Sequence, residues 1–119
     1  MIKQLRMSSI WSENLNNLLP FYRDTLGMTP ALETPGFVMF GDPNGVSLAL
    51  GTHSEIKGNT KEPARHMAGF ECTDIQAYCE RLKAAGVEFV EDLNKQPFGW
   101  IATIKDPEGN LIQLMQGEN

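Results

Sequence analysis

Few side chains in this sequence are of types that carry out chemistry. The chain has two histidines, His53 and His66, and the carboxylate of Glu71 lies a short distance after the second. Two imidazoles and one carboxylate are the ligand types of a facial triad for a divalent metal ion, but their spacing matches no metal-binding motif. The sequence also contains no nucleophile dyad, phosphate-binding glycine loop or cofactor motif. Whatever these three residues do therefore depends on the elements that position them.

Charge and composition exclude several classes of function. The chain has 119 residues, with 15 acidic and 10 basic side chains and a net charge of −5. This charge repels phosphate backbones and anionic lipid, so we expect no nucleic-acid partner. No apolar run approaches the ~18 residues that span a bilayer, and the N-terminus lacks the pattern of a signal peptide, so we expect no membrane partner and a cytoplasmic location. Cys72 and Cys79 are too few for a disulfide framework and are predicted to be buried free thiols.

Two segments with the same order of signals cover nearly the whole chain. Each begins with a strand-like run, at residues 3–11 and 65–72. A helical pattern follows and ends at Gly27 in the first segment and at Gly86 in the second. Strand material comes next and closes on a hairpin with an Asp-Pro-X-Gly turn. This repeat predicts two copies of one βαβββ module.

The two predicted helices differ in their signals. In the first, Ser12 or Asn14 can cap the helix, and Pro20 lies inside the pattern, where it costs about 3 kcal/mol, so we expect a kink or a late start. In the second, residues 73–76 have the form of a capping box. The predicted apolar stripes are Leu15, Leu18, Leu19, Tyr22 and Leu26 in the first helix and Ile75, Tyr78, Cys79, Leu82 and Ala85 in the second.

The repeat also predicts how the chain is organised. We expect one domain over residues 1–119, with module one at 2–53, a polar linker at 54–64 and module two at 65–116. A small sheet with a helix on one face keeps its other face open. Two such sheets side by side make a curved trough, which is where a ligand would bind. The predicted fold class is α+β, with the two modules forming a cup-shaped, partly open mixed sheet.

Two motifs give the chain a resemblance to a known family. Residues 21–28 (FYRDTLGM) resemble the helix-ending motif, and residues 106–114 (DPEGNLIQL) the final hairpin, of the vicinal oxygen chelate superfamily. That superfamily includes glyoxalase I, bleomycin-resistance proteins, fosfomycin-resistance enzymes and extradiol dioxygenases. The resemblance covers residues 2–116 and implies the paired-module cup. It says less about activity, because the fold hosts metal enzymes and metal-free binding proteins alike.

The resemblance also implies where a metal would bind. Enzymes of this superfamily hold a divalent metal with His, Gln or Glu from the first and last strands of each module. Those positions fall on Met7, Ala49, Met67 and Gln113. Two thioethers, a methyl group and one neutral amide offer almost nothing to a hard or borderline cation. We therefore expect no metal and no other cofactor, with a divalent metal ion as the alternative.

The alternative metal site depends on residues close to these positions. His66 precedes Met67 and should face away from the cup unless a bulge shifts the strand register. Glu71 shares the cup face with Met67, and Gln113 is the one family position with a donor atom of a usual type. His53 is most simply an exposed loop histidine. The candidate metal ligands are thus His66, Glu71 and Gln113, and Glu71 is also the candidate catalytic residue.

The rest of the predicted cup face is largely apolar and rich in methionine, which suits flat aromatic ligands. Trp11, Phe98 and Trp100 are candidate stacking platforms, although strand alternation places Trp100 under the helix. The alternative is that the methionines simply fill a core between the sheets. The predicted ligand-binding residues are Met7, Ser9, Phe37, Met39, Ala49, Met67, Glu71, Ile101, Thr103, Gln113 and Met115.

Three functions are compatible with these features. The leading hypothesis is a metal-free protein that binds or sequesters a small hydrophobic or cationic aromatic compound, as the resemblance to bleomycin-resistance proteins implies. The second is a metal-dependent lyase, isomerase or dioxygenase whose ligands are displaced. The third is a metal-free enzyme with Glu71 as a general base desolvated by the cup. We also expect a homodimer, because half-cups leave edges and apolar faces that one short chain closes poorly.

Overall fold

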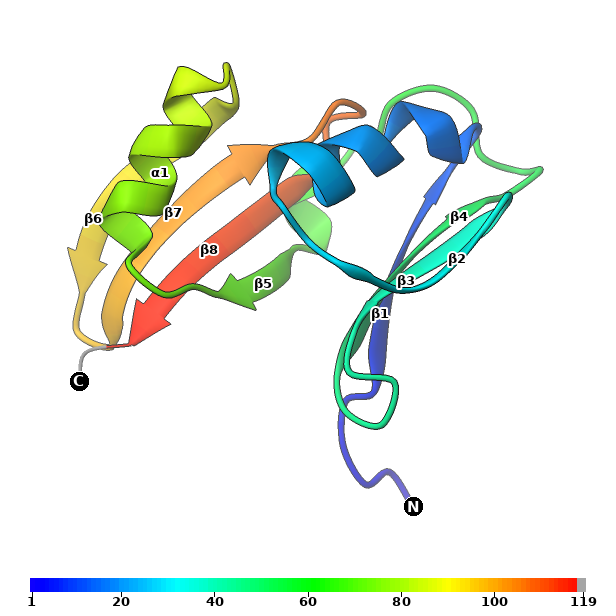
Figure 1. The fold of residues 1–119 in the computed structure, drawn as a ribbon, viewed down its shortest axis with the longest axis horizontal. Coiled ribbons are helices and arrows are strands. Elements are labelled where there is room, and N and C mark those ends of the chain that lie inside the picture. Colours follow the sequence, from blue (N-terminus) through cyan, green and yellow to red (C-terminus); the bar gives the residue numbers. More distant parts are fainter. Residues whose placement is uncertain (118–119) are drawn as a thin grey trace. The chain divides into compact units, whose positions relative to one another are not determined.

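Each half of the chain forms its own four-stranded mixed sheet (Figure 1). The structure is a computed structural model, described here for residues 1–117. The strand order is β1-β4-β3-β2 in the first sheet and β5-β8-β7-β6 in the second. In both sheets the first and last strands of the module pair in parallel, and the remaining pairs are antiparallel. This confirms the α+β class and the two-module architecture with open sheets.

The boundary between the two compact units falls after Gly58, inside the predicted linker. Module one has two short helical segments and four strands: β1 (Met7–Ser12), η1 (Leu15–Asn17), η2 (Phe21–Thr25), β2 (Pro30–Thr34), β3 (Phe37–Gly41) and β4 (Ser47–Thr52). Module two has one short turn, one regular helix and four strands: η3 (Pro63–Arg65), β5 (Ala68–Glu71), α1 (Ile75–Ala84), β6 (Glu88–Gln96), β7 (Gly99–Lys105) and β8 (Leu111–Gly117).

Each module has a core between one sheet face and its helix. In module one the predicted helical stripe is confirmed, since all five of its members are at most 9% exposed. They pack with the sheet residues Val38, Phe40, Leu48 and Leu50, which are at most 4% exposed. In module two the corresponding sheet residues are Ala102, Ile104, Ile112 and Leu114. The burial of alternate strand residues fixes which face of each sheet is covered.

The first helix is irregular, as Pro20 predicts. A 3₁₀ turn is capped by Asn14, whose Oδ1 accepts a hydrogen bond from the Asn16 N–H at 3.0 Å. After Pro20 the chain widens into a π-helix, in which the Leu26 N–H donates to the Phe21 carbonyl at 2.8 Å. Proline has no N–H and cannot continue a regular helical ladder, so the interruption appears as a change of helix type.

The second helix is regular, but its N-terminus differs from the prediction. Asp74 occupies the cap position in the left-handed region, with φ of 46°, and its side chain makes no capping bond. The predicted capping box is therefore wrong. Instead, Gln116 Oε1 on β8 accepts a hydrogen bond from the Ile75 N–H at 2.7 Å. Ala85 is exposed at the C-terminal cap and does not belong to the buried stripe. The helix ends at Gly86 with a φ of 86°, as predicted.

The first strand of each module starts later than predicted. Before β1, the Arg6 guanidinium donates to the carbonyls of Pro43 and Gly45 in the hairpin turn. Before β5, the 3₁₀ turn η3 takes up the first residues of the predicted strand. These later starts come from side-chain contacts and local turns, which the alternation of apolar and polar residues along a strand does not predict.

The two cysteines also differ from each other. Cys79 is buried in α1, as predicted, whereas Cys72 is only half-buried, which corrects the prediction for that residue. Among the residues that the structure describes, no helix is long and apolar enough to cross a membrane.

Candidate functional site

Strand register shows which predicted site residues of module one share a face. Ser9 lies beside Ala49 across the β1/β4 pair, and Met39 lies beside Ala49 across the β3/β4 pair. Met7 and Phe37 each lie two residues away from these along their strands, so they point to the same side. We call this side, which the helical segments do not cover, the open face of module one.

The same argument applies to module two. Gln113 pairs with Gly69 on one side and with Thr103 on the other, and Met115 pairs with Glu71 and Ile101. Their strand neighbours Ile112 and Leu114 are buried under the helix side, so these residues lie on the opposite, open face. Met67 precedes β5 and is half-buried. The register thus groups the predicted site residues of each module on one open face.

The open faces combine accessible apolar surface with a few polar groups. The side chains of Phe37, Met39, Ile101 and Met115 are partly exposed, and Met7 is 41% exposed. Other members of the predicted set are packed away, since Ala49 is 1% and Thr103 6% exposed. Ser9 and Gln113 are half-buried and contribute the polar groups of this set.

An indole ring covers one end of the open face of module one. A Cβ placed on Gly51 would lie 2.3 Å from the ring of Trp11, so the ring lies directly over this glycine. The imidazole of His53 meets the indole edge to face, with ring centroids 5.7 Å apart. His53 Nδ1 also accepts a hydrogen bond from the Glu55 N–H at 3.1 Å. His53 lies in a loop with its side chain 41% exposed, in agreement with the prediction, and it also contacts the indole and the following turn.

A flexible side chain takes the comparable place in module two. A Cβ placed on Gly69 would lie 2.6 Å from Cε of Met115, so the end of this methionine covers the glycine. Trp11 could have been found in the sequence as the partner of a strand glycine, because glycine within a strand often marks a close approach. Gly69 in β5 gives the same signal, but it does not identify Met115 as the partner, since methionine packs against many shapes.

The four positions that would carry metal ligands do not form a donor set. Within the described residues, no three His, Cys, Asp or Glu side chains gather closely enough to hold a metal ion. Ala49 has no donor atom, Met7 and Met67 offer thioethers, and only Gln113 supplies an oxygen. Oxygen, imidazole and thiolate ligands are what divalent enzyme metals require. These residues do not fit a divalent metal ion.

The remaining candidates for catalysis are dispersed. His66 is exposed in an extended conformation just before β5, and Glu71 is exposed at the end of that strand. Next to Glu71, burial raises the pKa of the Cys72 thiol above its ordinary value, and the carboxylate adds to this shift. A raised pKa keeps the thiol protonated at neutral pH, which makes it a poor nucleophile.

The aromatic candidates fall into different environments. Phe98 is 56% exposed in the turn between β6 and β7. Trp100 pairs with Gln116, and alternation puts it on the same side as Ala102 and Ile104, under the helix. Lys95 lies 5.8 Å from the centroid of its ring. Trp11 is thus the tryptophan that lies on an open face.

With the geometry in place, comparison with known proteins identifies the family. The family model described as "Glyoxalase/Bleomycin resistance protein/Dioxygenase superfamily" matches residues 4–114. The chain belongs to this superfamily, as the resemblance of its two motifs predicts.

Several individual proteins are similar over almost their whole length. The uncharacterized protein YetH of Bacillus subtilis (strain 168) is 26% identical over 120 residues, covering 98% of this chain and all of that protein. The crystal structure of TnmS3, an antibiotic binding protein from Streptomyces sp. CB03234, matches with a TM-score of 0.73 and 22% identity, covering 98% of both chains. The structure of lactoylglutathione lyase from Agrobacterium tumefaciens matches with a TM-score of 0.72 and 19% identity, covering 98% of this chain and 95% of that one. At these identities the two structures show a shared fold.

Proposed function

We propose that this chain binds a small hydrophobic or cationic aromatic compound on its open sheet faces, without a metal ion. The observation that carries the proposal is the donor chemistry at the four family positions, where Met7, Ala49, Met67 and Gln113 supply one neutral amide between them. A metal enzyme of the same superfamily would need ligands from elsewhere in the chain.

The surface of the open faces supports binding rather than catalysis. Methionine is polarizable and flexible, so Met39 and Met115 can adapt to the shape of a planar ligand. Trp11 offers a half-exposed ring for stacking. Ser9 and Gln113 can orient the ligand through hydrogen bonds, as a few polar groups do in most ligand sites. This composition lacks a nucleophile and a paired acid and base.

Charge supports the choice of a cationic or neutral ligand. The net charge of −5 attracts cations and repels anions. Glu71 is exposed at the rim of the open face of module two, beside Met115. The antibiotic-binding description of one structure with the same fold agrees with a role in binding or sequestering such a compound.

A ligand screen with matched variants tests this proposal. We expect one or more planar aromatic compounds, cationic ones above all, to raise the melting temperature of the wild-type protein. Gln113→Asp places a charge on the open face and should weaken binding of an apolar ligand while the protein stays folded. Gln76→Asp makes the same change on the exposed side of α1 and should leave binding intact. If no compound shifts the wild-type melt, or if both variants lose binding equally, the proposal fails.

We also propose that the protein is a cytoplasmic homodimer. The outer edges of β1 and β5 and the apolar open faces are surfaces that a second copy can cover. Sedimentation velocity at micromolar concentration should give the mass of two chains, and a monomer would contradict the dimer. Recovery of the native protein in a membrane or secreted fraction would contradict the location.

A further inference from the structure

Module one has a groove on the face of its sheet that lies opposite the open face. Glu33 lies beside Val38 in the β2/β3 pair, and Val38 is fully buried under the helical segments, so this is the helix side. The groove has a volume of about 540 Å³, within the usual range of small-molecule sites. Its lining residues are Leu15, Asn16, Leu19, Pro20, Arg23, Glu33, Thr34 and Pro35.

The groove follows from the broken helix and the short edge strand. Strand β2 lies at the edge of the sheet, and its last four residues are exposed. The helical segment changes from a 3₁₀ turn to a π-helix beside Pro20, so it does not pack against β2 as a regular helix would. π-Helical segments of this kind are frequent at functional sites.

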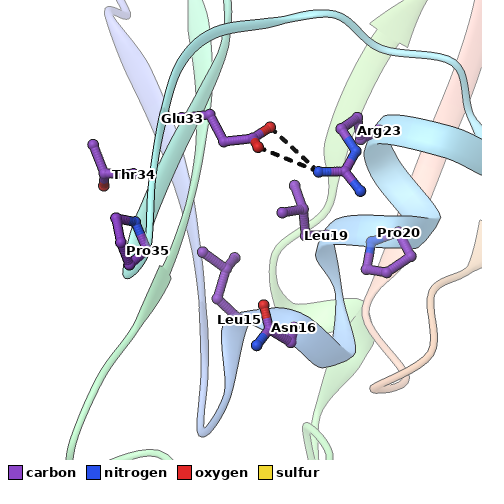
Figure 2. Close-up of a pocket in the computed structure, with 8 residues that line it drawn as sticks. All are labelled: Leu15, Asn16, Leu19, Pro20, Arg23, Glu33, Thr34 and Pro35. Atoms are coloured by element: carbon purple, nitrogen blue, oxygen red, sulfur yellow. Dashed lines mark hydrogen bonds and ion pairs between the residues drawn. The ribbon is translucent and has the colours of Figure 1, made fainter.

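The lining combines an aliphatic floor with a charged rim. Figure 2 shows the side chains of Arg23 and Glu33 pointing toward each other from the helical segment and from β2. Leu15 and Leu19 lie between the two walls, and Pro35 and Pro20 lie on opposite sides of the groove. The residues that line the groove include no aromatic ring. The floor therefore suits an aliphatic or alicyclic group.

The charges at the rim are unequally paired. Arg23 makes two hydrogen bonds to Asp24, from Nε at 3.0 Å and from Nη2 at 3.1 Å. Its remaining contact, from Nη1 to both carboxylate oxygens of Glu33, is longer at 3.4 Å. These bonds raise the pKa of Arg23, and the bond from Arg23 lowers the pKa of Asp24. Arg23 and Glu33 line the groove, and Asp24 lies beside Arg23 outside the lining, so the three groups together carry a net charge of −1.

We propose that this groove is a second binding site, for a small aliphatic ammonium ion. The ammonium group donates hydrogen bonds to Glu33, which accepts bonds of 3.4 Å from Arg23 Nη1. The aliphatic body lies against Leu19, Pro20 and Pro35. A carboxylate ligand is disfavoured, because Asp24 already occupies the two best donors of Arg23. The site lies within module one and does not depend on the open-face function.

Titration of the full-length protein with cyclohexylmethylammonium, followed by amide chemical shifts, tests the proposal. We expect saturable shifts around residues 19, 23 and 33, with a dissociation constant in the millimolar range. Cyclohexylmethanol and cyclohexylacetate, which keep the ring and change the charge, should bind more weakly. Failure of the ammonium compound to saturate, or stronger binding of the carboxylate, would overturn the proposal.

Two substitutions at the rim make the test specific. Glu33→Gln should weaken ammonium binding by about threefold or more, as expected for a partly exposed ion pair. Arg23→Gln removes the competing cation and should strengthen binding of the ammonium, whereas it would abolish binding of an anion. Glu62→Gln breaks a similar exposed pair with Arg65 outside the groove and should change nothing. Gln113→Asp, on the open face of the other module, should also leave this binding unchanged. Weaker binding in Arg23→Gln, or equal loss in Glu33→Gln and Glu62→Gln, would contradict the proposed site.

Discussion

The two modules share one topology but present different surfaces on their open faces. In module one a rigid indole, Trp11 on the first strand, covers a glycine of the last strand, Gly51. In module two the arrangement is reversed, since Met115 on the last strand covers Gly69 of the first strand. The repeat therefore preserves the backbone pairing while the side chains above it differ. One face offers a flat ring and the other a flexible thioether.

The helix sides of the modules differ as well. In module two α1 is regular, and Gln116 binds its N-terminus. In module one the helical segment changes type beside Pro20, and a groove lies between it and β2. Pro20 thus lines the groove that distinguishes the helix side of module one from that of module two. The comparison shows that duplicated modules can diverge on both faces without a change of sheet order.

The largest expected effect separates the two faces of module two. Ile112→Asp places an unpaired carboxylate at a fully buried position and should cost about 4 kcal/mol or more, against a total stability of about 5 to 15 kcal/mol. Gln113→Asp, at the adjacent half-buried position, should leave the protein folded. Thermal melts of the two variants measure this difference in stability. Equal loss of stability would mean that the open face is itself a packed core.

Alanine at the two covered glycines compares the two modules directly. Gly51→Ala pushes against the rigid ring of Trp11 and should destabilise the protein by about 1 to 2 kcal/mol. Gly69→Ala meets only the flexible end of Met115 and should change stability by less than about 0.5 kcal/mol. Urea denaturation measures both changes. Adding Trp11→Ala to Gly51→Ala should recover part of the loss, and the absence of coupling would contradict the contact.

Removal of the helix-capping side chains compares the two helix starts. Gln116→Ala leaves the Ile75 N–H without its acceptor and should cost about 1 kcal/mol. Asn14→Ala removes the cap of the 3₁₀ turn in module one and should cost a similar amount. Gln116→Glu keeps an acceptor at a helix N-terminus and should preserve stability. Equal destabilisation by Gln116→Glu and Gln116→Ala would show that the hydrogen bond is unimportant.

The smallest expected effect concerns the thiols of module two, which contains both cysteines of the chain. Burial raises the pKa of Cys72 and, by the same cause, of Cys79. Since the thiolate is the reactive form, alkylation of both should require higher pH than alkylation of free cysteine. Half-buried Cys72 should react before buried Cys79. Labelling rates from pH 7 to 10, resolved by peptide mass, check the order, and faster labelling of Cys79 would contradict it.

Much of this architecture could be predicted from the sequence, because repeats and alternation act locally. The apolar stripe of the first helix, the glycine stops at Gly27 and Gly86 and the mixed sheets all follow from such signals. The cap of α1 could not be predicted in the same way. It depends on Gln116, which lies 41 residues away from Ile75 along the chain. Long-range contacts of this kind arise only from the completed fold.

The sheet face on which the candidate residues lie could also be predicted. Strand periodicity grouped residues such as Ser9, Met39 and Gln113 on the open faces, where the register places them. Periodicity does not show which of these side chains are covered, as Ala49 and Thr103 are. The sequence also contains no indication of the groove beside Pro20, because the groove depends on how the irregular helix packs beside an edge strand.

The central claim, that this member of the superfamily works without a metal ion, is tested most directly by elemental analysis. The protein should be purified without chelator or affinity metal and then dialysed. We predict far less than one equivalent of nickel, zinc, iron or manganese per chain, because Met7, Ala49, Met67 and Gln113 cannot hold such an ion. One tightly held equivalent that is lost in the His66→Ala variant would contradict the claim and establish displaced ligands instead.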